Sequence, residues 1–296
     1  MKKIIRSIVF ALAAAGLVPA AWAGSFASTE VAISDINVGS QFPEVAVYGG
    51  IIHVVFVGYG TGSQGDIYYA RSTNNGGSFT VPIILSGTTG NDRPQVTAGP
   101  NGVFVAWNSN NDTGAVYVRR SADGGANFAA AFVAGGVEGG SFYSRLTSLF
   151  TDTSGNVHIG YYDNSATGGA AGMIMHRMIC SGTSLGADTA VTGQLIDGDA
   201  DNEQPRMGQA GGKLYVVFRS SRNGNPQSGW PPYSIQMQTG TIGGCAATWS
   251  YPARRLAGGL PLNYGSTWRP EVVGEASGNV HVAWWENALG ANVFYR

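Results

Sequence analysis

The chain has 296 residues, with 17 basic and 18 acidic side chains, 45 glycines and two cysteines. Its nearly balanced charge and the absence of a basic run argue against a nucleic-acid-binding surface. The high glycine content and the lack of a sustained 3.6-residue apolar period indicate an all-β protein, in which short strands alternate with turns of Gly, Asn, Asp and Ser.

The first 23 residues have the pattern of a cleavable signal peptide. A basic start up to Arg6 precedes an apolar run over residues 8–18, and Ala21 and Ala23 fit the small-x-small rule for cleavage. The apolar run is too short and too rich in Ala and Gly for a spanning helix. We therefore expect a periplasmic or secreted monomer without a membrane span after cleavage, folded as one domain over residues 24–296.

Five similar units follow one another along the chain, and each begins with a short strand. The units start near Pro43, Pro94, Thr147, Pro205 and Pro270. Their spacing of roughly 50–65 residues is at or above the period of propeller repeats. The second strand of each unit is rich in β-branched and aromatic residues with little alternation, which is typical of strands buried on both faces. These second strands are Ile51–Val57, Val103–Trp107, Val157–Tyr161, Leu214–Phe218 and Val280–Trp284.

The units predict a five-bladed β-propeller of four-stranded blades, with six blades as the alternative. The last residues, 292–296, are similar to 66–71, a strand that precedes an internal turn, and residues 24–34 are similar to 77–86, which follow that turn. A ring needs its last unit completed by its first, whereas a linear stack needs caps. We therefore expect a strand over Ala27–Ser34 to close the last blade. The expected pairs join Val31 and Ile33 to Val293 and Tyr295.

The turn between the third and fourth strands carries a recognisable motif. Ser121–Phe128 matches the Asp-box pattern Ser/Thr-x-Asp-x-Gly-x-x-Trp/Phe, and Ser72–Phe79 matches it with Asn in place of Asp. Degenerate versions occupy residues 181–186 and 243–249. In such a turn the Asp side chain bonds the backbone, Gly supplies a positive φ, and the aromatic residue anchors the turn between sheets. Over nearly all of residues 24–296 the chain resembles the sialidase-like, or bacterial neuraminidase repeat, propellers.

That resemblance implies a propeller fold in which the boxes are structural and face away from the active site. Catalytic members use three arginines for the substrate carboxylate, a Tyr nucleophile paired with Glu, and an Asp acid/base, within six blades. Arg93, Arg145 and Arg269 could imitate the three arginines, although Arg145 lies one residue earlier in its unit. The Phe/Tyr-Arg-Ile-Pro motif is missing and the Tyr/Glu pair has no counterpart. Asp163 and Glu286 would suit acid/base chemistry if they lay roughly 5–9.5 Å apart.

The predicted ligand-binding residues lie where loops gather on one face of the ring. The planar guanidinium group of arginine matches a carboxylate, and an aromatic ring can stack on a sugar ring. This side of the propeller is therefore suited to a sugar acid or another polar ligand. In the alternative interpretation, the Arg-Pro strand starts are structural braces of the repeat. The candidates are Arg93, Arg145 and Arg269 before first strands, Asn108, Tyr162, Arg219 and Trp285 after second strands, and Trp230 in a long fourth-repeat loop.

Three further features bear on cofactors and packing. Asp197, Asp199 and Asp201 alternate as in the start of a calcium loop, although a solvated acidic turn is the alternative. No other cofactor is predicted. Cys180 and Cys245 lie in neighbouring repeats of an exported chain, where disulfides persist, but a bond requires Cα atoms within about 7 Å. Both states of the pair stay open.

Histidine recurs at the second position of the second strand. His53, His158 and His281 stand where Phe104 and Tyr215 stand in the other units, so we interpret this as a packing position. For function, the sequence favours a binding module for a glycan or for a cell-surface or matrix partner. A sialidase-like glycoside hydrolase and a structural scaffold without a small ligand are the alternatives.

Overall fold

The computed structural model describes residues 30–34, 39–59, 65–87, 90–109, 114–136, 144–164, 172–192, 202–220, 234–250, 253–258, 267–286 and 292–296. The chain divides into two units, one ending at Val31 and one running from Ala32 to Arg296, and every described strand belongs to the second unit. The part of the chain that is described holds no helix long and apolar enough to cross a bilayer.

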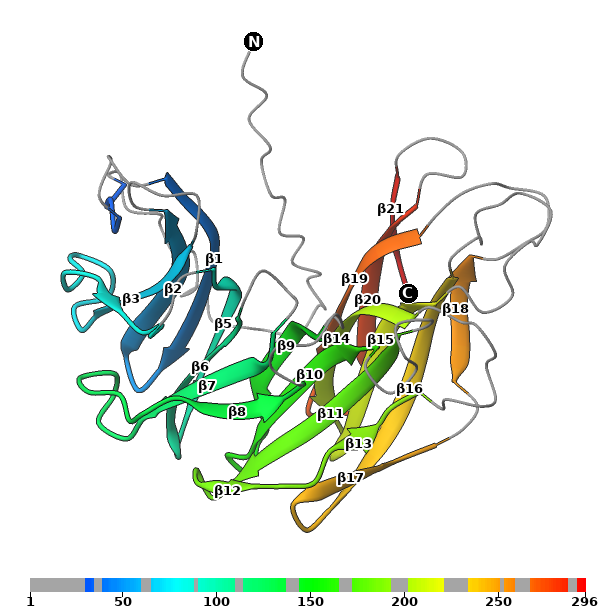
Figure 1. Ribbon diagram of the computed structural model, residues 1–296. Coiled ribbons are helices and arrows are strands. Elements are labelled where there is room, and N and C mark those ends of the chain that lie inside the picture. The colour runs from blue at the N-terminus through cyan, green and yellow to red at the C-terminus, as the bar shows by residue number, and fades with distance from the viewer. Residues whose placement is uncertain are drawn as a thin grey trace, which may run out of the picture. The chain divides into compact units, whose positions relative to one another are not determined.

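Within the described residues, twenty-one strands form five antiparallel sheets, which we call blades 1 to 5 in chain order (Figure 1). Blade 1 contains β1 (Gly39–Tyr48), β2 (Ile51–Tyr59), β3 (Asp66–Ser72) and β4 (Ile83–Ile84). Blade 2 contains β5 (Asp92–Gly99), β6 (Gly102–Asn108), β7 (Val116–Ser121) and β8 (Phe132–Gly135). In both blades each strand pairs with the next one along the chain.

Blades 3 and 4 follow the same order but split their fourth position between two short strands. Blade 3 contains β9 (Ser144–Thr151), β10 (Val157–Asp163), β11 (Met173–Cys180), β12 (Ser184–Leu185) and β13 (Thr189–Ala190). Blade 4 contains β14 (Asn202–Ala210), β15 (Lys213–Ser220), β16 (Ser234–Gly243), β17 (Ala246–Trp249) and β18 (Arg254–Gly258). Blade 5 contains β19 (Thr267–Gly274), β20 (Val280–Glu286) and β21 (Asn292–Tyr295). The protein is a five-bladed β-propeller, as the repeats predict.

Hydrophobic clusters fill the spaces between successive blades. Val55 of blade 1 packs with Val105 of blade 2, and further clusters join blade 2 to 3, 3 to 4 and 4 to 5. In β15, Val216 faces the cluster shared with blade 3, whereas Val217 faces the cluster shared with blade 5. Because successive side chains of a strand point to opposite faces, a strand between two blades needs apolar residues at every position. This explains the unbroken apolar runs of the second strands.

The predicted closing strand is not among the described strands. Residues Glu30–Ser34 are not assigned to any strand, and the described part of blade 5 has three strands with β21 at its edge. The predicted pairing with Val293 and Tyr295 is therefore absent from the described ladders, and residues 27–29 lie outside the described part of the chain. The expectation rested on a local sequence likeness, which does not specify a partner more than 250 residues away in the sequence.

Candidate functional site

In four of the five blades the first strand has the same unusual backbone conformation near its start. Phe42, Arg93, Gln204 and Arg269 have φ values of 52°, 51°, 52° and 48°, and each is followed by proline. At each of these positions the strand register shifts, because the two residues oppose a single residue of the neighbouring second strand. Each of these irregularities is thus a β-bulge, a feature that changes the direction of side chains and is common beside functional sites.

The four bulges surround one cavity of about 470 Å³. Its lining comes from only three positions of each strand start: the residue before proline, the proline itself and the residue after it. The lining residues are Phe42, Glu44, Arg93, Pro94, Gln95, Gln204, Arg206, Arg269, Pro270 and Glu271. Blades 1, 2, 4 and 5 therefore present equivalent positions to one space.

Polar contacts link neighbouring blades around this cavity. Gln95 Nε2 donates to Glu44 Oε1 at 3.2 Å, so blades 1 and 2 are joined. Arg206 Nε donates to Glu271 Oε1 at 3.1 Å and joins blades 4 and 5. The backbone N–H of Arg269 donates to the side-chain oxygen of Gln204 at 2.9 Å.

The cavity combines three arginines with two glutamates. Two of the arginines have acidic partners, since Arg93 Nε lies 3.6 Å from Asp92 Oδ2 and Arg206 Nε lies 3.1 Å from Glu271 Oε1. The planar guanidinium fork matches the geometry of a carboxylate. Burial raises the pKa of Glu44; the Arg206 guanidinium opposes that rise and the Glu271 carboxylate adds to it. A raised pKa favours the protonated carboxyl group, which is the form that can donate a proton.

The structure brings together two of the three arginines that the sequence singles out. Arg93 and Arg269 line the cavity, and the third arginine there is Arg206. Arg145 lies in β9 opposite Tyr162, and its side chain falls outside the described residues. The sequence contained a signal that Arg206 belongs to this site, because Arg206 follows Pro205 at its strand start just as Glu44 follows Pro43.

The candidates after the second strands occupy a different place. Asn108, Tyr162, Arg219 and Trp285 share one repeat position, and the cavity lining does not include them. Asn108 and Arg219 are buried, whereas Tyr162 and Trp285 are partly buried. A ligand role for these four stays a prediction.

The acidic candidates are only partly described. Asp163 is buried at the end of β10, and Glu286 ends β20, where it pairs with Thr267. The Glu286 side chain lies outside the described residues, so the separation of the two carboxyl groups is untested. Trp230, Asp197, Asp199 and Asp201 also fall outside them. Within the described ranges, no group of three His, Cys, Asp or Glu residues could hold a metal ion.

The turn at Ser121–Phe128 has the hydrogen bonds that its residue pattern predicts. Asp123 Oδ1 accepts from the Ser121 hydroxyl at 2.7 Å and from the backbone N–H of Asn127 at 2.9 Å. The Asn127 backbone N–H, the Ser121 hydroxyl and the Asn127 side chain together lower the pKa of Asp123 well below its usual range. Phe128 packs edge-on against Tyr69 of blade 1, with ring centroids 4.8 Å apart. The turn therefore fastens blade 2 to blade 1.

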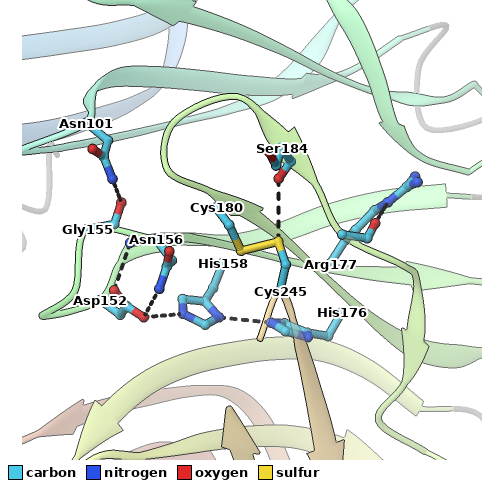
Figure 2. The surroundings of a disulfide bond; sticks show 11 residues. Asn101, Asp152, Gly155, Asn156, His158, His176, Arg177, Cys180, Ser184 and Cys245 are labelled. Atoms are coloured by element: carbon cyan, nitrogen blue, oxygen red, sulfur yellow. Dashed lines mark hydrogen bonds and ion pairs between the residues drawn. A yellow bond between two sulfur atoms is a disulfide. The ribbon is translucent and has the colours of Figure 1, made fainter. Parts of the chain in front are cut away.

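Cys180 and Cys245 form a disulfide between blades 3 and 4 (Figure 2). Their Cα atoms lie 5.8 Å apart, which settles the question that the sequence left open. Figure 2 shows a buried polar network beside this bond, running from Asp152 through His158 to His176. The bond and the network both hold blade 3 in place, and neither touches the cavity at the strand starts.

No family model matches this chain, and no curated protein matches it. An ulvan lyase of polysaccharide lyase family 25 has a similar structure, with a TM-score of 0.59 at 10% identity over 88% of this chain and 70% of that one. An α-L-arabinanase from Penicillium chrysogenum gives 0.53 at 15% identity over 85% and 78%. The Hadza microbial sialidase Hz136 gives 0.53 at 13% identity over 87% of this chain, which spans 56% of the sialidase chain.

These similarities establish a shared fold. The compared proteins are an arabinanase, a sialidase and an ulvan lyase, and at identities of 10–15% the likeness shows a common fold alone. The sialidase among them agrees with the sialidase-like resemblance of the sequence at the level of the fold. Fold alone does not specify chemistry, so the residues of the cavity must supply the argument for function.

Proposed function

We propose that this protein is an exported propeller that binds an acidic glycan in the cavity at its strand starts. The observation that carries the proposal is the convergence of Arg93, Arg206 and Arg269, from three different blades, on one cavity. The cavity volume of about 470 Å³ is within the usual range for ligand pockets. The signal-like pattern of residues 1–23 supports export.

The mixture of side chains favours a carbohydrate over a simple anion. Phe42 and Pro270 offer apolar surface, while Glu44 and Gln95 offer hydrogen-bonding groups for hydroxyls. Arginines supply the fork for a carboxylate. The fold shared with an arabinanase, a sialidase and an ulvan lyase is compatible with a glycan ligand.

The test is calorimetric titration of the protein lacking residues 1–23 with acidic and neutral oligosaccharides. Suitable pairs are trigalacturonate against galactotriose and sialyllactose against lactose. We expect only the acidic member of a pair to bind. Arg269→Ala should weaken binding about 10- to 100-fold, the loss for hydrogen bonds to a charged group, with an unchanged melting temperature.

Arg254→Ala is the matched control, because Arg254 is an exposed arginine of β18 outside the cavity lining. It should leave the affinity unchanged. Equal loss in both variants, or equal binding of acidic and neutral sugars, would contradict the proposal. If Arg269→Ala lowers the melting temperature and leaves binding unchanged, the arginine is a structural brace. A protein that binds no sugar fits the scaffold alternative.

A second function, cleavage of the bound glycan, is favoured by one observation. Glu44 and Glu271 line the same cavity, and the pKa of Glu44 is raised. Such a pair resembles the acid and base that glycoside cleavage requires. Turnover of fluorogenic sialosides and arabinosides, abolished by Glu44→Gln with binding retained, would support cleavage. Binding without turnover of either substrate would leave a binding module.

A further inference from the structure

The left-handed residues before proline are costly positions for the chain. Among the described residues, six other than glycine have positive φ, and four of these are Phe42, Arg93, Gln204 and Arg269. Proline restricts the preceding residue to extended conformations, so a positive φ at that position is doubly unfavourable. Such backbone strain is maintained by its surroundings and clusters at functional sites.

Glycine would remove the cost, because it adopts positive φ without a steric penalty. The chain has 45 glycines, yet none of the four positions is glycine. Each instead carries a large side chain that lines the cavity. The presence of these side chains in place of glycine therefore indicates a role beyond that of shaping the turn.

The four side chains differ in chemistry while their backbones are equivalent. Two are arginines, one is an amide and one is aromatic. Phe42 is 45% exposed and lines the cavity, so its ring is accessible to a ligand bound there. The side-chain oxygen of Gln204 accepts the backbone N–H of Arg269, so Gln204 fixes the strand start that presents Arg269.

We propose that the residue before proline in blades 1, 2, 4 and 5 is the specificity position of this site, and that Phe42 is the stacking platform for a pyranose ring whose carboxylate is held by Arg93 and Arg269. The proposal rests on the proposed glycan-binding function and assigns the ligand class: a cyclic sugar acid. An aromatic face covers the apolar face of a ring, and convergent polar groups then fix its orientation. A linear dicarboxylate or inorganic phosphate offers no such face.

The first arm of the test varies the platform. Calorimetry with trigalacturonate and sialyllactose compares Phe42→Trp and Phe42→Leu with the wild type. Trp keeps an aromatic face and should bind within about threefold of the wild type, whereas Leu should weaken binding at least about tenfold, the effect of roughly 1.4 kcal/mol. Phe294→Leu is the matched control, because Phe294 is a partly exposed phenylalanine of β21 outside the cavity. It should not change the affinity.

The second arm separates strain from ligand contact. Arg93→Gly and Gln204→Gly both remove a side chain and relieve the positive φ. Arg93→Gly should raise the melting temperature by about 2–4 °C, the shift for a gain near 1 kcal/mol, while weakening binding. Gln204→Gly also removes the hydrogen bond to the Arg269 N–H, so it should weaken binding without this gain in melting temperature. Asn75→Gly is the control, since Asn75 has a φ of 55° in a turn outside the cavity. It should leave binding unchanged.

The outcomes distinguish this inference from the function on which it rests. If the wild-type protein binds neither acidic oligosaccharide, the proposed function and this inference both fall. If it binds while Phe42→Leu and the glycine variants bind equally well, only this inference falls. A glycine variant that melts earlier and keeps its affinity would show a brace and overturn the assignment of that residue.

Discussion

Blades 3 and 5 contain the same hairpin in two different environments. Residues 154–158 and 277–281 both read Ser-Gly-Asn-Val-His, and each stretch follows an acidic residue two positions before its serine. In blade 3 His158 Nε2 lies 3.2 Å from Asp152 Oδ2, and in blade 5 His281 Nε2 lies 2.9 Å from Glu275 Oε1. Both hairpins thus join an acidic side chain to the histidine six residues later.

The two hairpins differ in the burial of their acid–histidine pairs. The side chains of Asp152 and His158 are fully buried, whereas those of Glu275 and His281 are 48% and 36% exposed. From His158 the blade 3 network continues to His176, 2.9 Å away, whose ring packs edge-on against Trp249 of blade 4. A turn that is local in blade 5 therefore becomes part of an interface between blades in blade 3, because a second blade covers it.

The disulfide should contribute the largest single difference between the two blades. It ties blade 3 to blade 4, and the 65-residue separation of its cysteines implies about 4 kcal/mol of unfolding free energy from loop entropy. We expect Cys180→Ser/Cys245→Ser to lose about this amount in urea denaturation. Reductant should destabilise the wild type equally and have no effect on the variant. Equal stability of variant and wild type would show that the interface needs no cross-link.

Removing the hairpin acid should reveal the effect of burial directly. Asp152→Ala leaves His158 and the backbone N–H groups of Ser154 and Asn156 without their acceptor in the core, at a cost of about 3 kcal/mol. Glu275→Ala removes contacts with the Ser277 hydroxyl, the Asn279 side chain and His281 at the surface, and should cost much less, because water replaces them. Urea midpoints of the two variants compare them. Similar losses of unfolding free energy would mean that the contribution of the acidic residue depends on the turn itself and not on its burial.

The pH dependence of stability should be set by the buried histidines. Burial, with a smaller contribution from His158, lowers the pKa of His176 to about 3, so the folded state keeps it neutral. The unfolded chain binds the proton near pH 6.5, so stability is fully present above that value and falls as the pH drops toward 3. By pH 5 the loss from His176 alone is about 2 kcal/mol.

Variants can assign that loss to particular groups. His176→Gln should flatten the decline between pH 6.5 and 5. His53→Gln in blade 1 should have a similar effect, because burial and then the charge of Arg71 lower the pKa of His53 to about 4. Asp152 contributes only at lower pH: burial acts to raise its pKa, but the His158 and Asn156 hydrogen bonds lower it to about 2. An unchanged slope in both histidine variants would assign the loss elsewhere.

The repeats made the fold predictable, because blade number and second strands follow from apolar runs that recur along the chain. Arg93 and Arg269 could also be predicted at one face from their place at strand starts. The positive φ before proline could not, since the local preference of that position is extended and only the assembled ring overrides it. The contacts of Arg206 and the disulfide depend on distances between blades, which the sequence does not encode locally. The repeated Ser-Gly-Asn-Val-His was a visible signal for the acid–histidine hairpins.

The disulfide also determines what a protease can release. The segment between Cys180 and Cys245 contains the whole β14–β15 hairpin. Both residues of its turn, Gly211 and Gly212, are exposed. A single backbone cut at this turn would leave two fragments that remain covalently joined. On a non-reducing gel the nicked protein would migrate as one species, and it would separate into two only after reduction. In an extracellular setting the propeller would thus survive such a cut as one connected molecule.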